Sequence, residues 1–359
     1  MDLDTELEAW VRLSLLPGLS EENFRRLLVA LGGPQQILAA SAADLTRIIP
    51  QRAVAAVFAQ VSRGQMREIG AWLDDPVNHI LTLADSSYPQ NLLQISDPPP
   101  VLYAKGGTDL LNQPSFAVVG SRNATHQGLA HAELFARVLS DAGLTIVSGL
   151  ALGIDAAAHR GALAGASSSI AVVGTGLDIV YPARNRDLAH ELAARGCIIS
   201  EFALGTAPVA ANFPRRNRLI SGLARGCLVV EAAISSGSLI TARMANEQGK
   251  DVFAIPGSIH SPLAKGCHNL IKQGAKLVET AEDILEELHM PARGRPPEVA
   301  GQYVTSDRVL DALGFDPFDI DTLSARSGMS ADKIAALLTE WELDGVVEAL
   351  PGGRYQRVR

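Results

Sequence analysis

Glycine and serine recur at five points in the middle of the chain, each directly after a short, largely β-branched apolar run. Such turns let the backbone approach an anionic oxygen closely, and phosphate is the anion that they suit. A tight turn without a ligand would explain any one of them, but it is a poor explanation for five. The five turns lie at residues 120–122, 148–155, 174–176, 231–238 and 256–258.

Basic side chains gather in the same part of the chain. Residues 202–230 contain no Asp or Glu, and their arginines are Arg215, Arg216, Arg218 and Arg225. The neighbouring Phe213 and Asn217 add a ring on which a base could stack and an amide. A solvated loop and a packed helix start would need no ligand, but the local charge excess favours contact with an anionic one.

Three further candidate contacts follow other strands. Arg122 comes directly after the first apolar run, where its planar guanidinium could bind a phosphate through two hydrogen bonds. Arg184 and Asn185 follow the turn at 174–176, together with Tyr181. Arginines and amides that hold a backbone, beside aromatic rings that stack bases, would form a rim for single-stranded nucleic acid.

Catalytic and cofactor motifs are missing from this pattern. Gly174 and Gly176 resemble the start of a dinucleotide fingerprint, but Ile179 stands where the next glycine is required, which disfavours an NAD enzyme. Asp155 and His159 have the spacing of an acid/base or metal pair, yet no second ligand set and no nucleophile elbow accompanies them. We expect Asp155 to cap its helix and His159 to pack against or bond to a neighbouring loop. No catalytic residue, metal or cofactor is predicted.

The elements that carry these residues alternate between strand and helix. Nearly continuous apolar strands separated by helices predict a mostly parallel sheet covered on both faces. In such a doubly wound α/β domain the ligand site lies at the carboxyl ends of the strands, where the five turns stand. The domain is expected at 111–289, with strands at 116–119, 144–147, 170–173, 198–200, 228–230 and 252–255.

Smaller segments flank the predicted sheet. Residues 1–75 have apolar residues at helical spacing with Pro/Gly breaks and predict several short helices, and 76–110 form a connector with little periodicity. A linker at 290–303 leads to a domain at 304–359 whose element order is that of a winged helix. Its helices are expected at 306–313, 320–327 and 331–343, and its hairpin at 346–358.

The net charge alone argues against a protein that coats nucleic acid nonspecifically. The chain has 31 Lys+Arg and 39 Asp+Glu, a net charge of −8, whereas proteins that bind mainly by neutralising phosphates usually carry a positive excess. The segment 111–290 is balanced, with 15 basic and 15 acidic residues, so the whole acidic excess lies in the flanks. The net charge of the whole chain therefore does not describe the charge of the predicted site.

The cysteines and the N-terminus bear on the compartment. Cys197, Cys227 and Cys267 have a spacing that fits neither a disulfide framework nor a CxxC metal site, which favours a reducing compartment. The chain begins without the basic and apolar regions of a secretory signal, and its longest uncharged stretch, 161–177, is too polar to cross a bilayer. We expect a cytoplasmic protein with no membrane partner.

Six motifs, in order along the chain, closely resemble those of the DNA-processing protein A family, also called Smf. They occupy residues 118–122, 148–159, 174–185, 212–218, 236–242 and 255–257. The resemblance extends over nearly the whole chain and is strongest in the α/β domain. It implies an α/β fold with an extended Rossmann-like parallel sheet, flanked by an N-terminal helical domain similar to a SAM or helix-hairpin-helix unit and by a C-terminal winged helix.

The same resemblance implies a function. Family members are non-enzymatic homodimers of the bacterial cytoplasm that bind single-stranded DNA during natural transformation, protect it and load the RecA recombinase onto it. With Phe213 and Arg215 from the basic segment, the predicted DNA-binding residues are Ser121, Arg122, Gly149, Arg184, Asn185, Phe213, Arg215, Arg216, Asn217, Ser236, Gly237 and Ser238.

The flanking domains are expected to contact proteins rather than DNA. The N-terminal domain has Ser20 where a helix-hairpin-helix unit normally has its second glycine, and Glu21 and Glu22 follow. The predicted recognition helix at 331–344 carries four acids against Lys333 alone, which opposes insertion into a DNA groove. A protein-binding or regulatory role is the better hypothesis for the winged helix.

Two alternatives would use the same scaffold. A nucleotide-processing enzyme, such as a nucleotide-monophosphate glycosidase, would carry P-G-G-x-G-T with a nearby Glu. The P-G-G at 351–353 lacks the following Gly-Thr and lies in the predicted wing. A nucleotide sensor would use the same pocket, and competition between a nucleotide and oligo-dT would reveal it.

Overall fold

The structure is a computed structural model that describes residues 4–290, 317–343 and 345–357. Its centre is a nine-stranded sheet with the order β1-β2-β6-β5-β4-β3-β7-β8-β9. All pairings from β6 to β9 are parallel, whereas β1 and β2 are antiparallel additions at one edge. The strands are β1 (Asn78–Thr82), β2 (Val101–Gly106), β3 (Ser115–Val119), β4 (Thr145–Ser148), β5 (Ser169–Val172), β6 (Cys197–Ser200), β7 (Gly226–Val229), β8 (Asp251–Ala254) and β9 (Lys276–Leu277).

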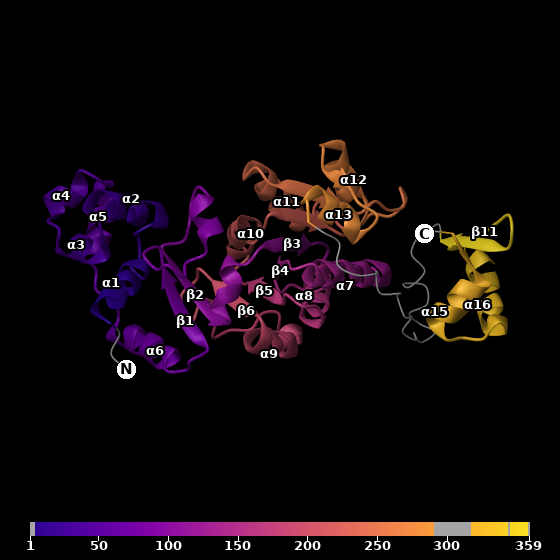
Figure 1. Ribbon diagram of the computed structural model, residues 1–359, viewed down its shortest axis with the longest axis horizontal. Helices are drawn as coiled ribbons and strands as arrows, with labels where there is room; N and C mark the ends of the chain where they lie inside the picture. The colour runs from indigo at the N-terminus through magenta and orange to yellow at the C-terminus, as the bar shows by residue number, and fades with distance from the viewer. Residues whose placement is uncertain (1–3, 291–316, 344, 358–359) are drawn as a thin grey trace.

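Helices cover both faces of this sheet, as the apolar strands predicted (Figure 1). Successive strand residues point to opposite faces, so Phe116 and Val118 join one core while Ala117 and Val119 join the other. The helices of the first core are α7 (His126–Asp141), α8 (Ile154–Ala164) and α13 (Ala281–Glu287), with α9 (Arg186–Arg195) beside α8. Those of the second are α10 (Asn212–Leu223), α11 (Ser238–Glu247) and α12 (Lys265–Lys272).

The strand order reverses beside β3. The chain runs outward from β3 through β4 and β5 to β6, and then crosses back to place β7 on the other side of β3. Ligands of doubly wound folds bind at such a switch point, outside the carboxyl ends of the strands. The ends of β3 and β7 therefore mark the place where a ligand is expected.

The predicted connector at 76–110 contains more regular structure than its sequence suggested. It supplies β1 and β2, which pair with each other and, through β2, with β6. Most residues of both strands are buried, so the period of two that marks a half-exposed strand is absent. The segment is thus part of the sheet rather than a link between domains.

The N-terminal segment forms short helices, as predicted, and packs onto the edge of the sheet (Figure 1). Its core includes Trp10, Leu27 and Ile37 together with Ile80 of β1 and Tyr103 of β2. We call residues 4–75 the head. Its helices are α1 (Thr5–Ser14), α2 (Glu21–Leu31), α3 (Pro34–Ala39), α4 (Ala42–Thr46), α5 (Gln51–Val57) and α6 (Arg63–Leu73).

The C-terminal part has the predicted winged-helix elements over the residues that the structure describes. They are β10 (Phe318–Asp319), α15 (Ile320–Ser327), α16 (Ala331–Leu343), β11 (Val347–Leu350) and β12 (Arg354–Arg357). Strand β10, which was not predicted, pairs with β12 of the hairpin. The helix predicted at 306–313 and, except for Met290, the linker at 290–303 lie outside the described residues. Pro351, Gly352 and Gly353 form the tip of the hairpin.

Cys197, Cys227 and Cys267 are free and buried, and burial raises the pKa of each thiol to about 12. Among the described residues, the helices are too short or too polar for any of them to span a bilayer.

Candidate functional site

The turns after β3, β4 and β7 interlock at the switch point. The Ser121 amide donates to the carbonyl of Glu231 at 2.7 Å, and the Ile154 amide donates to the carbonyl of Ser121 at 3.1 Å. Gly153 has φ +77°, and a Cβ there would lie 2.2 Å from the Ser121 oxygen. Only glycine permits this contact, so the residue type at 153 is what allows the turns after β3 and β4 to meet.

The turn after β4 uses its own amides internally. The Asp155 carboxylate accepts from the amides of Gly149 and Ala151, and His159 Nε2 accepts from the Leu150 amide at 3.3 Å. His159 was expected to bond to a neighbouring loop and does so, while Asp155 caps that loop rather than the start of its own helix. Burial, with help from nearby arginines, lowers the pKa of His159 to about 3, so the ring is neutral and able to accept. The amides of Gly149, Leu150 and Ala151 are therefore already used within the protein.

Arg216 occupies the interior of this turn. Its side chain is buried, and Nη1 donates to the carbonyl of Gly149 at 2.6 Å and to that of Val172 at the end of β5. Burial lowers the pKa of the guanidinium to about 10, with Asp155 acting in the opposite direction. Both Gly149 and Arg216 were predicted to bind DNA, and in the structure both are buried and bonded to each other. The two residues support the site from beneath.

Asn185 has the same kind of role. Its side chain is buried and donates to the carbonyls of Leu150 at 2.9 Å and Ala151 at 3.1 Å. Asn185 was predicted as a contact to DNA, and in the structure its amide nitrogen is used by the protein itself. With Arg216 it holds the turn after β4 in one shape.

An exposed aromatic platform lies above this support. The rings of Tyr181 and Phe213 are 5.6 Å apart between centroids, and Tyr181 is 44% exposed. The guanidinium of the exposed Arg122 lies 5.6 Å from the Phe213 centroid. A cation over an aromatic face is attracted by it and so holds its position. We call Arg122, Tyr181 and Phe213 the platform. Arg184, which follows Tyr181 closely in the sequence, is also exposed.

The N-terminal end of α11 lies beside α10, the helix that carries Phe213 of the platform. The Asn217 amide donates to the carbonyl of Gly237 at 3.4 Å, and Ser236 and Ser238 bond to each other through their hydroxyls at 2.7 Å. Gly237 is exposed and directly precedes α11. The first amides of α11 already have partners, since those of Ser238 and Leu239 donate to the hydroxyl and the carbonyl of Ser236, and that of Ile240 donates to the carbonyl of Gly237.

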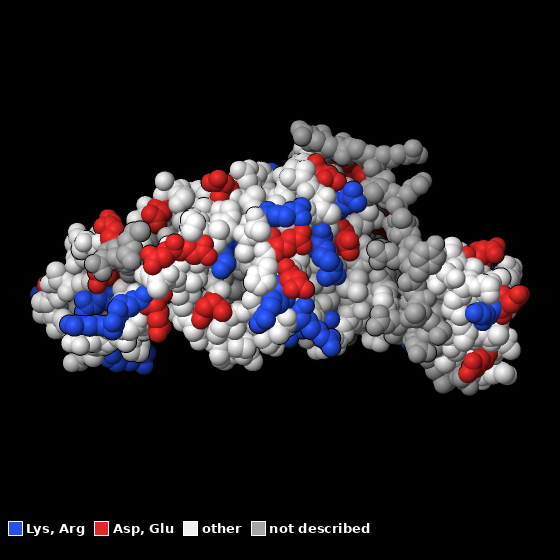
Figure 2. Space-filling model, turned by 90° about the horizontal axis from the view of Figure 1, so that it is seen from below, with Lys and Arg blue, Asp and Glu red and all other residues white. Residues whose placement is uncertain are grey.

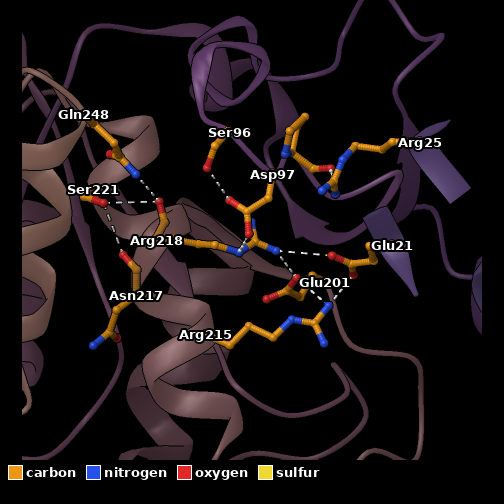
Figure 3. Close-up of polar contacts among 11 residues, drawn as sticks. Glu21, Arg25, Ser96, Asp97, Glu201, Arg215, Asn217, Arg218, Ser221 and Gln248 are labelled. Carbon is orange, nitrogen blue, oxygen red and sulfur yellow. Dashed lines mark hydrogen bonds and ion pairs between the residues drawn. The ribbon is translucent and has the colours of Figure 1, made fainter. Parts of the chain in front are cut away.

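The predicted arginine cluster is divided between two faces of α10. Phe213, Arg216 and Asn217 face the strand ends, whereas Arg215 and Arg218, three positions apart, share the face towards the head (Figure 3). Arg215 Nη2 lies 2.5 Å from Glu21 Oε1 and 3.2 Å from Glu201 Oε2.

Arg218 is the centre of an ion-pair network on this second face. It pairs with the buried Glu201, with Glu21 at 3.4 Å and with Asp97 at 3.0 Å (Figure 3). Glu201 and Asp97 were not predicted as partners of Arg218, because nothing in the sequence around them indicates it. A cavity of 740 Å³ between the head and α10 is lined by Glu21, Asp97, Glu201 and Arg215, among others.

The charges on the surface are mixed. Figure 2 shows basic and acidic side chains interspersed along the face seen from below, without a continuous basic surface. This agrees with the net charge of −8 and with a site that depends on a few placed cations.

Comparison with known proteins gives the family. The model for DNA recombination-mediator protein A matches residues 79–289, and that for the DprA winged helix domain matches residues 294–353. Protein Smf of Escherichia coli is 38% identical over 369 aligned positions, which cover 99% of this chain and 96% of Smf. DNA processing protein DprA of Streptococcus pneumoniae is 48% identical over 206 positions, covering 57% of this chain and 73% of the relative.

Solved structures agree with the sequence matches. The X-ray structure of DprA from Streptococcus pneumoniae superposes with a TM-score of 0.68 at 38% identity, over 80% of this chain and 99% of that one. The structure of DNA processing protein A from Helicobacter pylori, described for its single-stranded DNA binding mode, gives a TM-score of 0.54 at 31% identity, over 59% and 96%. The chain therefore belongs to the DprA/Smf family of DNA recombination-mediator proteins.

Proposed function

We propose that this protein binds single-stranded DNA at the carboxyl ends of β3, β5 and β7. The observation that carries the proposal is the platform, in which Arg122 lies over Phe213 and the exposed Tyr181 ring lies beside it. Unpaired bases present ring faces that stack on aromatic side chains, and an adjacent arginine neutralises the phosphate. The described single-stranded DNA binding mode of the Helicobacter pylori relative supports the same ligand.

The site residues then fall into two groups. Arg122, Phe213 and Tyr181 would meet the strand directly, together with Arg184, Asn217, Ser236 and Gly237 at the rim, whereas Ser238 is buried beside them. Ser121, Gly149, Asn185 and Arg216 are buried or internally bonded and would act by holding the turns in place. Arg215, on the other face of α10, would meet a strand that extends beyond the platform.

Membership of a recombination-mediator family supports a more specific set of roles in the handling of DNA. We infer that the protein acts in the cytoplasm as a homodimer, protects incoming DNA during natural transformation and loads RecA onto it. The mixed surface charge and net charge of −8 would limit nonspecific duplex binding.

Fluorescence anisotropy with labelled oligo-dT and a matched duplex tests the DNA proposal. We expect tighter binding to the single strand and a marked loss of affinity at higher salt. Equal affinity for both DNAs would refute the proposal. Nuclease digestion of the bound strand, the rate of RecA filament formation with and without the protein, and sedimentation velocity test protection, loading and dimerisation in turn.

A further inference from the structure

Among the ion pairs of the described residues, one joins the predicted DNA site to the head. It is the pair between Arg215 and the carboxylate of Glu21. Its side chain is 46% exposed and its Nη2 lies 2.5 Å from Glu21 Oε1. We propose that Glu21 competes with DNA phosphate for Arg215, so that the head lowers the affinity for single-stranded DNA until the strand displaces its carboxylate. This inference rests on the proposed function.

The network around Arg215 has a fixed part and an exchangeable part. The side chains of Arg218 and Glu201 are 7% and 0% exposed, so opening this pair would separate two buried charges at a high cost in free energy. The pair of Arg215 with Glu21 is exposed to solvent at 46% and 27%, where an ion pair contributes little and can open. Arg215 can therefore leave Glu21 while Arg218 stays in place.

Glu21 is held in position by the fold of the head. It is the first residue of α2, and Ser20 caps that helix by accepting from the Asn23 amide. Arg25, one turn further on, donates to the carbonyl of Pro98 at 3.0 Å and so ties α2 to the segment before β2. The head also shares its apolar core with β1 and β2. The carboxylate is thus presented to Arg215 by a rigid element.

The surroundings oppose a phosphate that approaches from this side. The cavity between the head and α10 is lined by Glu21, Glu22, Asp97 and Glu201 against Arg25 and Arg215. A DNA backbone that reaches Arg215 from the platform must replace Glu21 as its partner, because the remaining carboxylates repel it. The guanidinium of Arg215 also lies 5.4 Å from the centroid of the Phe202 ring.

A matched pair of variants tests the competition. Glu21→Gln and Glu22→Gln remove the same charge from neighbouring positions that both line the cavity, but the structure shows no ion pair for Glu22 within its described ranges. The full chain is titrated with labelled oligo-dT by anisotropy at two salt concentrations. We expect Glu21→Gln to bind about two- to fivefold more tightly, the range for an exposed ion pair, and Glu22→Gln to bind like the unaltered protein.

Arg215→Ala completes the cycle. In that background Glu21→Gln should give no gain in affinity, since the competed group is gone. An equal gain from both glutamate variants, or a gain from Glu21→Gln that persists without Arg215, would overturn the competition. If the unaltered protein fails to bind oligo-dT at low salt, the proposed function itself is wrong, and this result is distinct from unchanged affinity in Glu21→Gln.

Discussion

The guanidinium of Arg216 fills the space that a side chain at position 149 would need. A Cβ on Gly149 would lie 2.5 Å from Arg216 Nη1, and the same nitrogen donates to the Gly149 carbonyl at 2.6 Å. Glycine at this position and arginine in the middle of α10 therefore require each other. Both belong to the support of the site, beneath the platform that we propose as the surface that contacts DNA.

Gly149→Ala should destabilise the protein. The added methyl group overlaps a buried guanidinium that has two carbonyl partners, and forcing extra volume into a packed site costs about 1–3 kcal/mol. Thermal unfolding followed by circular dichroism measures the loss. Gly237→Ala is the control, because Gly237 has no atom within 4 Å of an added Cβ and its φ is −63°. Equal melting temperatures for the two variants would contradict this role of Gly149.

Replacing Arg122 should lower DNA affinity, whereas replacing Arg216 should lower the stability of the fold. Arg122→Ala removes an exposed cation, so DNA affinity falls and the slope of log affinity against log salt becomes shallower by about 0.7, while stability is unchanged. Arg216→Ala leaves the buried carbonyls of Gly149 and Val172 without a donor and lowers stability by about 3 kcal/mol. Urea unfolding and salt titrations of both variants make the comparison. An unchanged salt slope in Arg122→Ala would remove Arg122 from the set of phosphate contacts.

Tyr181 should contribute by stacking rather than through its hydroxyl. Tyr181→Ala is expected to weaken oligo-dT binding by about 1–3 kcal/mol, the range for one base stacked on an aromatic ring. Tyr181→Phe keeps the ring beside Phe213 and should bind normally. The salt slope should stay the same in both, because no charge is removed. A loss of binding in Tyr181→Phe equal to that in Tyr181→Ala would show that the ring face is not what matters.

Glu201 should make stability depend on pH near neutrality. Burial raises its pKa from 4.5 to about 7, Arg218 and Arg215 oppose this, and Glu21 and Asp97 add to it. The folded state therefore binds a proton that the unfolded state has already released, so this contribution is full below pH 4.5 and is lost as pH rises through about 7.

Glu201→Gln removes that titration. As pH rises from 4.5 to 7, the free energy of unfolding should fall less in the variant than in the unaltered protein. His159 acts in the opposite sense, because its lowered pKa makes stability fall as pH drops from 6.5 towards about 3, and this behaviour should remain in the variant. Urea unfolding across this range provides the measurement, and identical pH profiles would contradict the role given to Glu201.

The sequence was sufficient for strands β3 to β8 and for the region of the sheet edge where the site lies. Continuous apolar runs ending in glycine, such as the one before Gly120, mark buried strands, and the carboxyl ends of parallel strands meet at one edge. Strand β1 was missed because Asn78, His79 and Thr82 interrupt its apolar run without alternating, and β2 was missed because it directly follows three prolines at 98–100.

The roles of individual site residues depended on geometry that local patterns do not contain. Arg216 is buried and Arg215 exposed because of the rotational position of α10 against the sheet, which depends on packing across the whole core. Glu21 meets Arg218 across 197 positions of sequence. No spacing rule reaches that far, so the ion pairs between the head and α10 could not be predicted.

A single-stranded DNA site at the platform is tested by the binding of labelled oligo-dT to the unaltered protein and to Arg122→Ala, with the matched duplex measured alongside. We expect the unaltered protein to prefer the single strand, and Arg122→Ala to lose affinity for it while keeping its melting temperature. Equal binding to single strand and duplex, or full affinity in Arg122→Ala, would contradict a single-stranded DNA site at the platform.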